Sequence, residues 1–282
     1  GFTDVKSLEP GEAIIVDETG YRVVRYAECK RKAHCFFEWV YFSNVASEMD
    51  GRSVYQVRAD SGKQLAAVEE DHTDDGNSVV VPVPDTAKAA ADSFAYHMGI
   101  PCMEGLMRNR YVGRTFIQGA ATRGASMKNK YTPIPSILRG KRVFLVDDSI
   151  VRSTTMRSLV EHLRTAGGAA EVHVRVACPP IIAPCFYGID MSTLGELFGP
   201  AMVKEDYDGT PCEDTLTKMA AALGLDSIRY LTVPGLEQAI GRTRESLCLG
   251  CVTGDYPSEC GNNLYALAKS AFLAGKTGRT YE

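Results

Sequence analysis

Short apolar runs alternate with segments of helical apolar spacing through the middle of the chain. Residues 78–83 form a continuous apolar run that predicts a buried strand, and this run leads into an alanine-rich helix over residues 87–98. Residues 143–146 predict a second buried strand, followed by a helix over 154–165 and a third strand over 172–177. Strand, helix and strand at this spacing form a βαβ unit, so the pattern predicts a parallel sheet with helices on both faces.

The segments that flank this unit carry weaker patterns. Two β-branched runs, residues 13–16 and 21–24, are separated by Asp-Glu-Thr-Gly and predict a hairpin. Apolar residues at helical spacing predict a helix within residues 51–68, although Gly62 weakens that pattern. Residues 106–140 alternate basic, polar and Gly or Pro positions, which predicts a mobile stretch.

The composition is that of a globular protein and excludes two classes. Of the 282 residues, 45% are hydrophobic and 23% are charged, and the formal net charge of -4 argues against a general nucleic-acid binder. No apolar run approaches the roughly 20 residues needed to cross a membrane, and the first residues lack the basic and apolar regions of a signal peptide. The nine cysteines are an odd count in a chain that needs no disulfides, so metal-bound or buried thiols in the cytoplasm are expected.

Residues 143–155 carry the strongest chemical signal. Two adjacent acids, Asp147 and Asp148, end the predicted strand, and a hydroxyl-rich loop follows before the next helix begins. Carboxylates at the carboxyl end of a parallel strand lie in the crevice where open α/β sheets bind ligands, and a helix N-terminus attracts phosphate. The pattern suits a sugar phosphate, with the acids directed toward ribose hydroxyls or hydrated Mg²⁺. A turn that only caps the helix is the alternative interpretation.

This segment resembles the diphosphoribosyl-binding signature of type I phosphoribosyltransferases, and its immediate form resembles the amidophosphoribosyltransferases of purine synthesis. Further stretches resemble the same family in the family's order, namely residues 37–42, 109–117, 184–190 and 251–257. The resemblance implies the type I phosphoribosyltransferase fold, an α/β fold with a mainly parallel sheet, helices on both faces and a flexible loop that closes over the active site.

The resemblance also implies roles for individual residues. Asp147 and Asp148 are expected to contact the ribose and Mg²⁺, and Arg114 and Lys130 are expected to reach the pyrophosphate. The closing loop is expected to comprise residues 110–123 together with Lys130, with Arg110 and Tyr111 among its substrate-binding residues. A purely solubilising surface role is the competing interpretation for the cations Arg114, Lys130 and Arg123. Seven consecutive residues are expected to wrap the 5-phosphate: Ser149, Ile150, Val151, Arg152, Ser153, Thr154 and Thr155.

Cys248 and Cys251 form a C-x-x-C pair, which by itself fits zinc, redox and iron–sulfur roles. In the cluster-containing branch of the resembling family, positions similar to Cys35, Cys185, Cys248 and Cys251 supply four thiolates to a [4Fe–4S] centre. Ligand type alone fits zinc nearly as well, and the resemblance favours the iron–sulfur cluster. The other cysteines are expected to be buried or surface thiols: Cys29, Cys102, Cys178, Cys212 and Cys260.

The resemblance divides the chain into three parts. Residues 1–30 resemble the end of a glutaminase domain, residues 31–240 the phosphoribosyltransferase domain, and residues 241–282 a segment that completes the cluster site. The expected activity is transfer of phosphoribosyl from phosphoribosyl pyrophosphate to ammonia, giving 5-phosphoribosylamine in purine nucleotide synthesis. A glutaminase with its nucleophilic cysteine is not expected within this chain. The ammonia is then free or comes from a separate glutaminase subunit, or the chain is equally a fragment of a longer protein from which the glutaminase domain was removed. A homodimer or homotetramer is implied by the resemblance only.

Three differences from the family pattern fall close to the expected chemistry. Ser153 stands where the phosphate loop usually has glycine, and its Cβ is expected to crowd the phosphate or to meet a requirement for positive φ. Ala87 replaces a serine near the pyrophosphate, and residues 43–47 replace Ala-Arg-Pro-Asp-Ser. These differences leave open a paralog that uses another amine or a base, and a non-catalytic sensor of phosphoribosyl pyrophosphate or nucleotides. The intact acids and loop cations weigh against the sensor.

Overall fold

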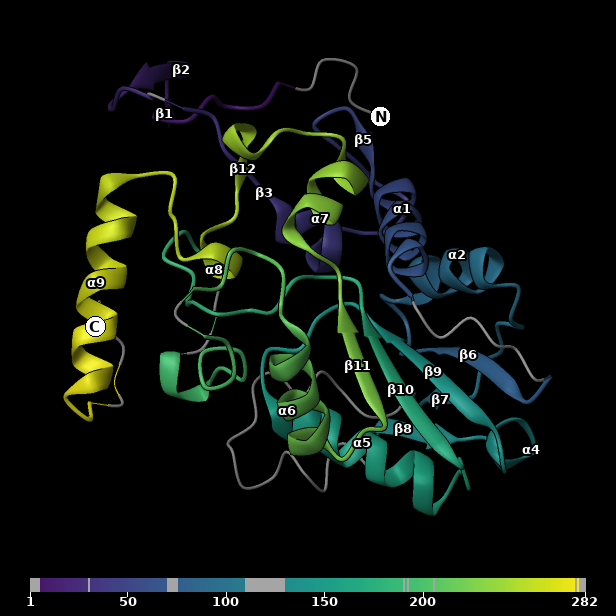
Figure 1. The fold of residues 1–282 in the computed structure, drawn as a ribbon. Coiled ribbons are helices and arrows are strands. Elements are labelled where there is room, and N and C mark those ends of the chain that lie inside the picture. Colours follow the sequence, from purple (N-terminus) through teal and green to yellow (C-terminus); the bar gives the residue numbers. More distant parts are fainter. Residues whose placement is uncertain are drawn as a thin grey trace.

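A four-stranded parallel sheet, in the order β11-β10-β9-β6, forms the centre of the protein (Figure 1). We describe it from a computed structural model, which covers residues 6–29, 31–69, 76–109, 130–189, 191, 193–204, 206–276 and 278. The inner strands are buried on both faces, as continuous apolar runs require. The four strands are β6 (Ser78–Pro82), β9 (Arg142–Asp147), β10 (Glu171–Val176) and β11 (Ser227–Tyr230).

The chain reverses its direction across the sheet between β6 and β9. Val80 of β6 forms a parallel bridge with Cys102 and pairs on its other side with Phe144 of β9. After β9 the chain continues away from β6, placing β10 and then β11 in parallel. A reversal of this kind leaves a crevice beyond the carboxyl ends of the strands, where open α/β sheets bind their ligands. Asp147, the last residue of β9, lies at this edge.

Helices cover both faces of the sheet, as the βαβ pattern predicts (Figure 1). On one face Phe94 of α2 (Lys88–Met98) packs on Phe144 at a ring distance of 6.0 Å, and α1 (Val54–Ala67) packs on α2. The other face is covered by α5 (Ser153–Thr165) and α6 (Glu213–Leu223). A Cβ on Gly62 of α1 would overlap the carbonyl oxygen of Ala90, so the glycine that weakens the helical pattern permits the close approach of α1 and α2.

The prediction of one irregular stretch over residues 106–140 is wrong at both ends of that stretch. β7 (Leu106–Arg108) and β8 (Tyr131–Pro133) pair antiparallel, and the short helix α4 (Pro135–Leu138) follows. Strands of three residues are shorter than the window over which a hydrophobic period can be recognised, which is why the sequence does not reveal them.

Shorter elements complete the described part of the chain. β3 (His34–Cys35) pairs in parallel with β12 (Leu247–Cys248), so segments near the two ends of the chain are joined. No helix among the described residues is long and apolar enough to span a membrane. The remaining elements are η1 (Glu38–Phe42), β4 (Glu48–Met49), β5 (Arg52–Ser53), η4 (Leu194–Glu196), α7 (Val233–Ile240), η5 (Arg244–Ser246), α8 (Gly250–Thr253) and α9 (Glu259–Leu273).

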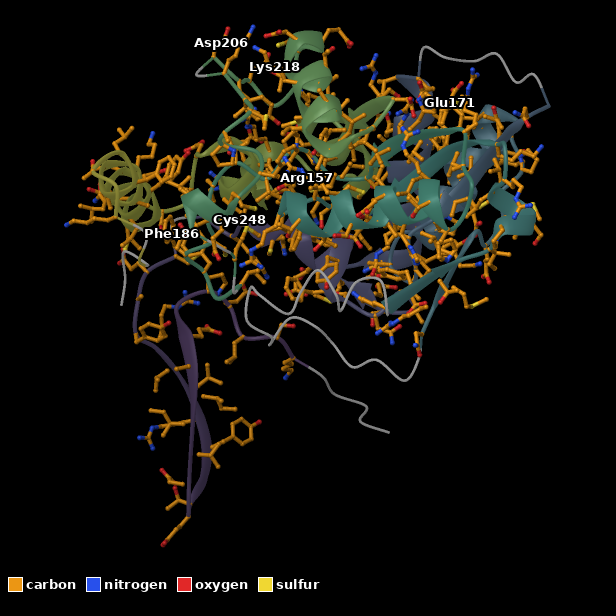
Figure 2. All side chains as sticks on the ribbon, turned by 90° about the horizontal axis from the view of Figure 1, so that it is seen from below. Arg157, Glu171, Phe186, Asp206, Lys218 and Cys248 are labelled. Atoms are coloured by element: carbon orange, nitrogen blue, oxygen red, sulfur yellow. The ribbon has the colours of Figure 1, made fainter. Side chains whose placement is uncertain are left out.

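The predicted hairpin is confirmed as β1 (Glu12–Asp17) and β2 (Gly20–Arg25), and Figure 2 shows it extending away from the body of the protein. An ion pair of 2.8 Å between Glu12 and Arg25 closes its base. Four apolar side chains of one face form cross-strand pairs and remain exposed: Ile14 with Val23 and Val16 with Tyr21.

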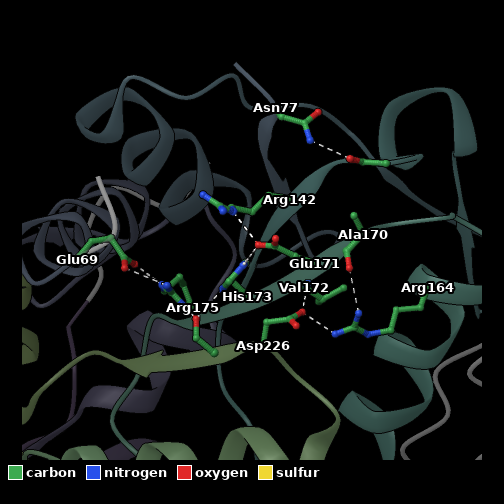
Figure 3. Close-up of polar contacts among 12 residues, drawn as sticks. Glu69, Asn77, Arg142, Arg164, Ala170, Glu171, Val172, His173, Arg175 and Asp226 are labelled. Carbon is green, nitrogen blue, oxygen red and sulfur yellow. Dashed lines mark hydrogen bonds and ion pairs between the residues drawn. The ribbon is translucent and has the colours of Figure 1, made fainter. Parts of the chain in front are cut away.

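A polar network is buried on the β10 face that carries His173 and Arg175 (Figure 3). The Arg175 guanidinium donates from Nε and Nη2 to the Glu69 carboxylate, which follows α1 in the chain. It also donates to the Ser227 hydroxyl at 3.0 Å and lies 5.2 Å from the centre of the Phe144 ring. The side chains of Arg175 and Glu69 are only 2% and 3% exposed, so the two opposite charges compensate each other away from water.

Candidate functional site

Asp147 and Asp148 lie at the carboxyl end of β9, where the sequence predicts a ligand site. The Asp148 N–H donates to Asp147 Oδ1 at 2.9 Å, and the Ser149 hydroxyl donates to Asp148 Oδ1 at 2.7 Å. Thr86, in the turn that follows β6, forms a further side-chain hydrogen bond with Asp148. Two adjacent strands thus bring two carboxylates and two hydroxyls to the same edge of the sheet.

Burial raises the pKa of both carboxyl groups. The pKa of Asp147 lies well above its ordinary value because the group is buried and because Asp148 is adjacent. Burial raises the pKa of Asp148 to about 6, while the hydrogen bond from Ser149 and the charge of Arg58 act in the opposite direction. Two half-buried carboxylates this close are stabilised by a cation or by hydroxyl donors, which are the groups that a sugar phosphate with Mg²⁺ provides.

The β7–β8 hairpin carries cations to the same edge. Burial and the charge of Arg108 lower the pKa of Lys130, which immediately precedes β8, whereas Asp147 and Asp148 act to raise it. Arg108 of β7 forms an ion pair of 2.6 Å with Asp85, in the turn after β6. Lys130 is therefore close enough to the two carboxylates for their charges to act on it, and Arg108, which the sequence does not single out, lies in the same region.

The loop that follows the carboxylates ends at an open helix N-terminus. α5 begins at Ser153, and neither a side-chain cap nor an acidic residue occupies its first turn. Arg152 forms an ion pair of 3.3 Å with Glu196, and its Nε is buried without an acceptor among the described residues. The Phe198 N–H donates to the Val151 carbonyl at 3.0 Å, so the segment after η4 braces the loop. Free amide donors and an unpaired guanidinium nitrogen at a helix N-terminus suit a phosphate group.

The other residues of the predicted phosphate loop lie between Asp148 and the first turn of α5. Ile150 is buried and anchors the loop, whereas Thr154 and Thr155 are exposed on the first turn of α5. Ser153 has no positive φ, because Asp50 is the only described non-glycine residue with that conformation. The expected requirement for positive φ at position 153 is therefore wrong for this chain. Ala87 is only 1% exposed and packs in the core, so it offers no group to a ligand.

Arg58 belongs to this region although no pattern in the sequence reveals it. Its side chain on α1 is buried and donates to the carbonyls of Trp39, Tyr41 and Ser43 at 2.8, 3.3 and 2.9 Å. Its charge also acts to lower the pKa of Asp148. One guanidinium thus joins residues 39–43 to the carboxylate edge, and an arginine among polar helical residues is otherwise typical of a solvated face.

The four cysteines singled out in the sequence lie around one pocket of about 370 Å³. Cys35 and Cys248 are register partners in the β3–β12 pair, and Cys251 lies on α8. Cys185 ends a buried segment that starts after β10, and this segment donates from Ile182 to the Cys251 carbonyl at 2.8 Å. Figure 2 shows Cys248 and Phe186, the residue after Cys185, on the side of the protein from which the hairpin extends.

Burial disfavours the thiolate form of three of these four cysteines. Burial raises the pKa of Cys35 to about 12 and also raises the pKa of Cys248 and Cys251. No three Cys, His, Asp or Glu side chains in the described part of the chain are arranged to hold a single metal ion. A single zinc ion would need all four sulfurs about 2.3 Å from it. A polynuclear cluster, in which each thiolate binds its own iron, sets the sulfurs farther apart.

The remaining predictions fall into two groups. The other five cysteines are free thiols, buried in the case of Cys178 and exposed in the cases of Cys29, Cys212 and Cys260, as expected. The predicted loop residues lie outside the residues that the structure describes: Arg110, Tyr111, Arg114 and Arg123.

Comparisons with known proteins agree with this geometry. Residues 55–180 match the family model of the phosphoribosyl transferase domain. The chain is 45% identical over 271 residues to the amidophosphoribosyltransferase of Methanocaldococcus jannaschii, covering 90% of this chain and 54% of that protein. It is 41% identical over 267 residues to the amidophosphoribosyltransferase of Bacillus subtilis, covering 92% of this chain and 52% of that protein.

Two solved structures are also similar. One is a glutamine phosphoribosylpyrophosphate amidotransferase from B. subtilis complexed with ADP and GMP, with a TM-score of 0.72 and 39% identity over 90% of this chain and 53% of that one. The other, described as the allosteric regulatory enzyme of purine biosynthesis, has a TM-score of 0.73 and 39% identity over 90% of this chain and 52% of that one. The chain spans about half the length of the curated relatives it matches. It thus contains a region that matches the phosphoribosyl transferase domain and is similar, over about half of their length, to amidophosphoribosyltransferases.

Proposed function

We propose that this chain transfers phosphoribosyl from phosphoribosyl pyrophosphate to ammonia and gives 5-phosphoribosylamine for purine nucleotide synthesis. The observation that carries the proposal is the pair Asp147 and Asp148 at the point where the sheet reverses direction, followed directly by the uncapped N-terminus of α5. Carboxylates and free amides at this spacing match the two ends of a ribose 5-phosphate. The relatives named amidophosphoribosyltransferase support the choice of reaction.

The residues act mainly by positioning and electrostatics. Asp147 and Asp148 orient the ribose hydroxyls and offer oxygen ligands of the kind that Mg²⁺ prefers. Mg²⁺, when bound, neutralises charge on the departing pyrophosphate. The loop from Ser149 to Thr155 holds the 5-phosphate on the first amides of α5, with Arg152 as an additional donor. Lys130, held beside the carboxylates, stabilises charge on the pyrophosphate as the bond to C1 breaks. Arg110, Tyr111 and Arg114 are proposed to act from the preceding loop.

Cys35, Cys185, Cys248 and Cys251 are proposed to bind a [4Fe–4S] cluster. The donor set supports this assignment, since four cysteines from three segments line one pocket. The cluster would supply positive charge that stabilises the buried thiolates, and the β3–β12 pair would then be fixed at both Cys35 and Cys248. Residues 241–282 are accordingly proposed to complete this site, with residues 31–240 forming the transferase domain and residues 1–30 resembling the end of a glutaminase domain.

The cellular setting is part of the same proposal. Nine free cysteines fit a reducing compartment, which favours the cytoplasm. The nitrogen is taken as free ammonia or received from a glutaminase, either a separate subunit or another part of a longer chain, and the assembly is a homodimer or homotetramer.

The proposal is tested by pyrophosphate release from phosphoribosyl pyrophosphate and Mg²⁺ under anaerobic conditions, with and without ammonium. We expect ammonium-dependent release that falls at least about a hundredfold in Asp147→Asn and is unchanged in Asp60→Asn, a matched substitution on α1. Release with a nucleobase but not with ammonium would identify a paralog. Binding measured by calorimetry without any release would identify a sensor.

The cluster is tested separately from the activity. Protein purified without oxygen should contain iron and acid-labile sulfide in equal amounts, and both should be lost in Cys248→Ser but retained in Cys260→Ser. Zinc without sulfide in the wild-type protein would refute the cluster.

A further inference from the structure

Three buried nitrogen donors that the proposed reaction does not use have no acceptor among the described residues. They are Nε1 of Trp39, Nε of Arg52 and Nε of Arg242. Trp39 lies on η1, Arg52 is the first residue of β5, and Arg242 follows Gly241, the residue that ends α7. A buried donor without a partner is unfavourable, so three of them in one region call for an acceptor that is a water or a bound anion.

The three side chains lie in the same neighbourhood of the fold. The Arg242 guanidinium is 5.9 Å from the centre of the Trp39 ring, and its Nη2 donates to the Asp50 carbonyl, two residues before Arg52. Arg52 reaches the end of α7, because a Cβ placed on Gly241 would lie 2.9 Å from Arg52 Nη2. The two guanidiniums therefore approach from β5 and from the end of α7, and the indole lies under one of them. Figure 1 shows β5 and α7 close together at the top of the fold.

No carboxylate in the described part of the chain forms an ion pair with Arg52 or Arg242, and the Arg52 side chain forms no hydrogen bond among these residues. The nearest acid in the sequence, Asp50, directs its carboxylate to His34 Nδ1 at 2.6 Å. Arg52 and Arg242 are both partly exposed, whereas the indole is 1% exposed. Two partly exposed arginines, each with a buried Nε, thus lie near a buried indole.

We propose that Arg52, Arg242 and Trp39 form a binding site for a phosphate group, separate from the phosphate loop of the proposed active site. Guanidinium groups bind phosphate through paired N–H donors, and Arg is preferred over Lys where such a fork is used. Because the Nε atoms have no acceptor and no carboxylate competes for them, an oxyanion is favoured over a cation or a neutral ligand. The site and the carboxylate edge are joined through Arg58, which donates to the Trp39 carbonyl and faces Asp148.

Trp39 is the only tryptophan in the chain, so tryptophan emission reports on the surroundings of this one side chain. We expect titration of the wild-type protein with inorganic phosphate, at constant ionic strength, to give a saturable change in tryptophan emission. Pyrophosphate serves as a second probe that distinguishes a single phosphate from a larger ligand, and acetate and chloride serve as anion controls. Arg52→Met should weaken the phosphate response about tenfold or more, and Arg52→Lys, which keeps the charge but not the fork, should give an intermediate value.

Two controls separate this site from other causes. Arg22→Met, on the exposed hairpin, and Thr154→Ala, in the proposed phosphate loop, should both retain the wild-type response. An unchanged response in Arg52→Met, or an equal response to chloride, would show a general ionic effect and refute the site. The absence of any response to phosphate in the wild-type protein would show that water satisfies the three donors, and would equally refute it.

Discussion

The buried pair of Arg175 and Glu69 offers a direct test of what stabilises the sheet. We expect Arg175→Met to destabilise the protein strongly, although methionine has nearly the same side-chain volume as arginine. The substitution leaves the Glu69 carboxylate, 3% exposed, without its guanidinium partner and removes the donor to Ser227 (Figure 3). Removing one partner of a buried ion pair costs about 3–5 kcal/mol, because the remaining charge is buried without compensation.

The assay is equilibrium unfolding in urea, followed by circular dichroism. With a slope of about 3 kcal/mol per molar, the expected loss lowers the midpoint by roughly 1–2 M urea. Glu69→Gln combined with Arg175→Met removes both charges, and we expect the double variant to recover at least half of the loss. Arg157→Met, which removes an exposed arginine from α5, should cost less than about 1 kcal/mol.

Two outcomes would refute this reasoning. If Arg175→Met cost no more than Arg157→Met, the buried charge of Glu69 would have found another partner or a proton. If the double variant were less stable than Arg175→Met alone, the hydrogen bonds of Glu69 rather than its unpaired charge would account for the loss.

Three further predictions concern packing, charge and the proposed site. Gly62→Ala should lower the midpoint of thermal unfolding, because the added Cβ overlaps the Ala90 carbonyl, even though alanine favours a helix over glycine by about 1 kcal/mol. The control Lys63→Ala should not lower the midpoint. Equal midpoints for the two variants would contradict the close approach of α1 and α2. Hydrogen bonds from His173 and Arg142 lower the pKa of Glu171 below its ordinary value of 4.5, so its contribution to stability is present above that value and is lost as the pH falls through the lower folded pKa. Glu171→Gln should therefore lower the urea midpoint slightly at pH 7, with a difference that shrinks toward pH 3; a constant difference would show that charge is not the cause. Lys130→Met should reduce pyrophosphate release about tenfold or more with an unchanged unfolding midpoint, and full activity would exclude Lys130 from the site.

The sheet and its two acids are predictable because their signals are local. The apolar runs of β6 and β9 and the alternating valines of β10 are bounded by turn residues, and the helix after Asp147 and Asp148 follows within a few positions. The periodicity of the sequence therefore predicts the βαβ unit. Because the two acids end a strand of a parallel sheet, they are expected at its carboxyl edge.

The missing parts of the site depend on contacts between distant segments. Arg58 reaches carbonyls 15 to 19 residues away, and Glu196 meets Arg152 across 44 residues. Neither contact leaves a periodic pattern, since a buried arginine on a helix has the same sequence appearance as a solvated one. Resemblance, and not spacing, groups the four cysteines in the sequence. The folded chain shows that all four line a single pocket.

The buried segment between β10 and Cys185 has a consequence for how this protein can change in evolution. Ala177 donates to the Asp147 carbonyl at 2.9 Å, Ile182 donates to the Cys251 carbonyl, and residues 177–184 are all buried. A chain fixed at both ends and enclosed along its length has no room for an additional residue, because any insertion must break one of these anchors or move Cys185 out of the pocket. Exposed loops accept insertions far more readily. The number of residues in this connector, more than their identity, is therefore the property that we expect descendants of this sequence to keep.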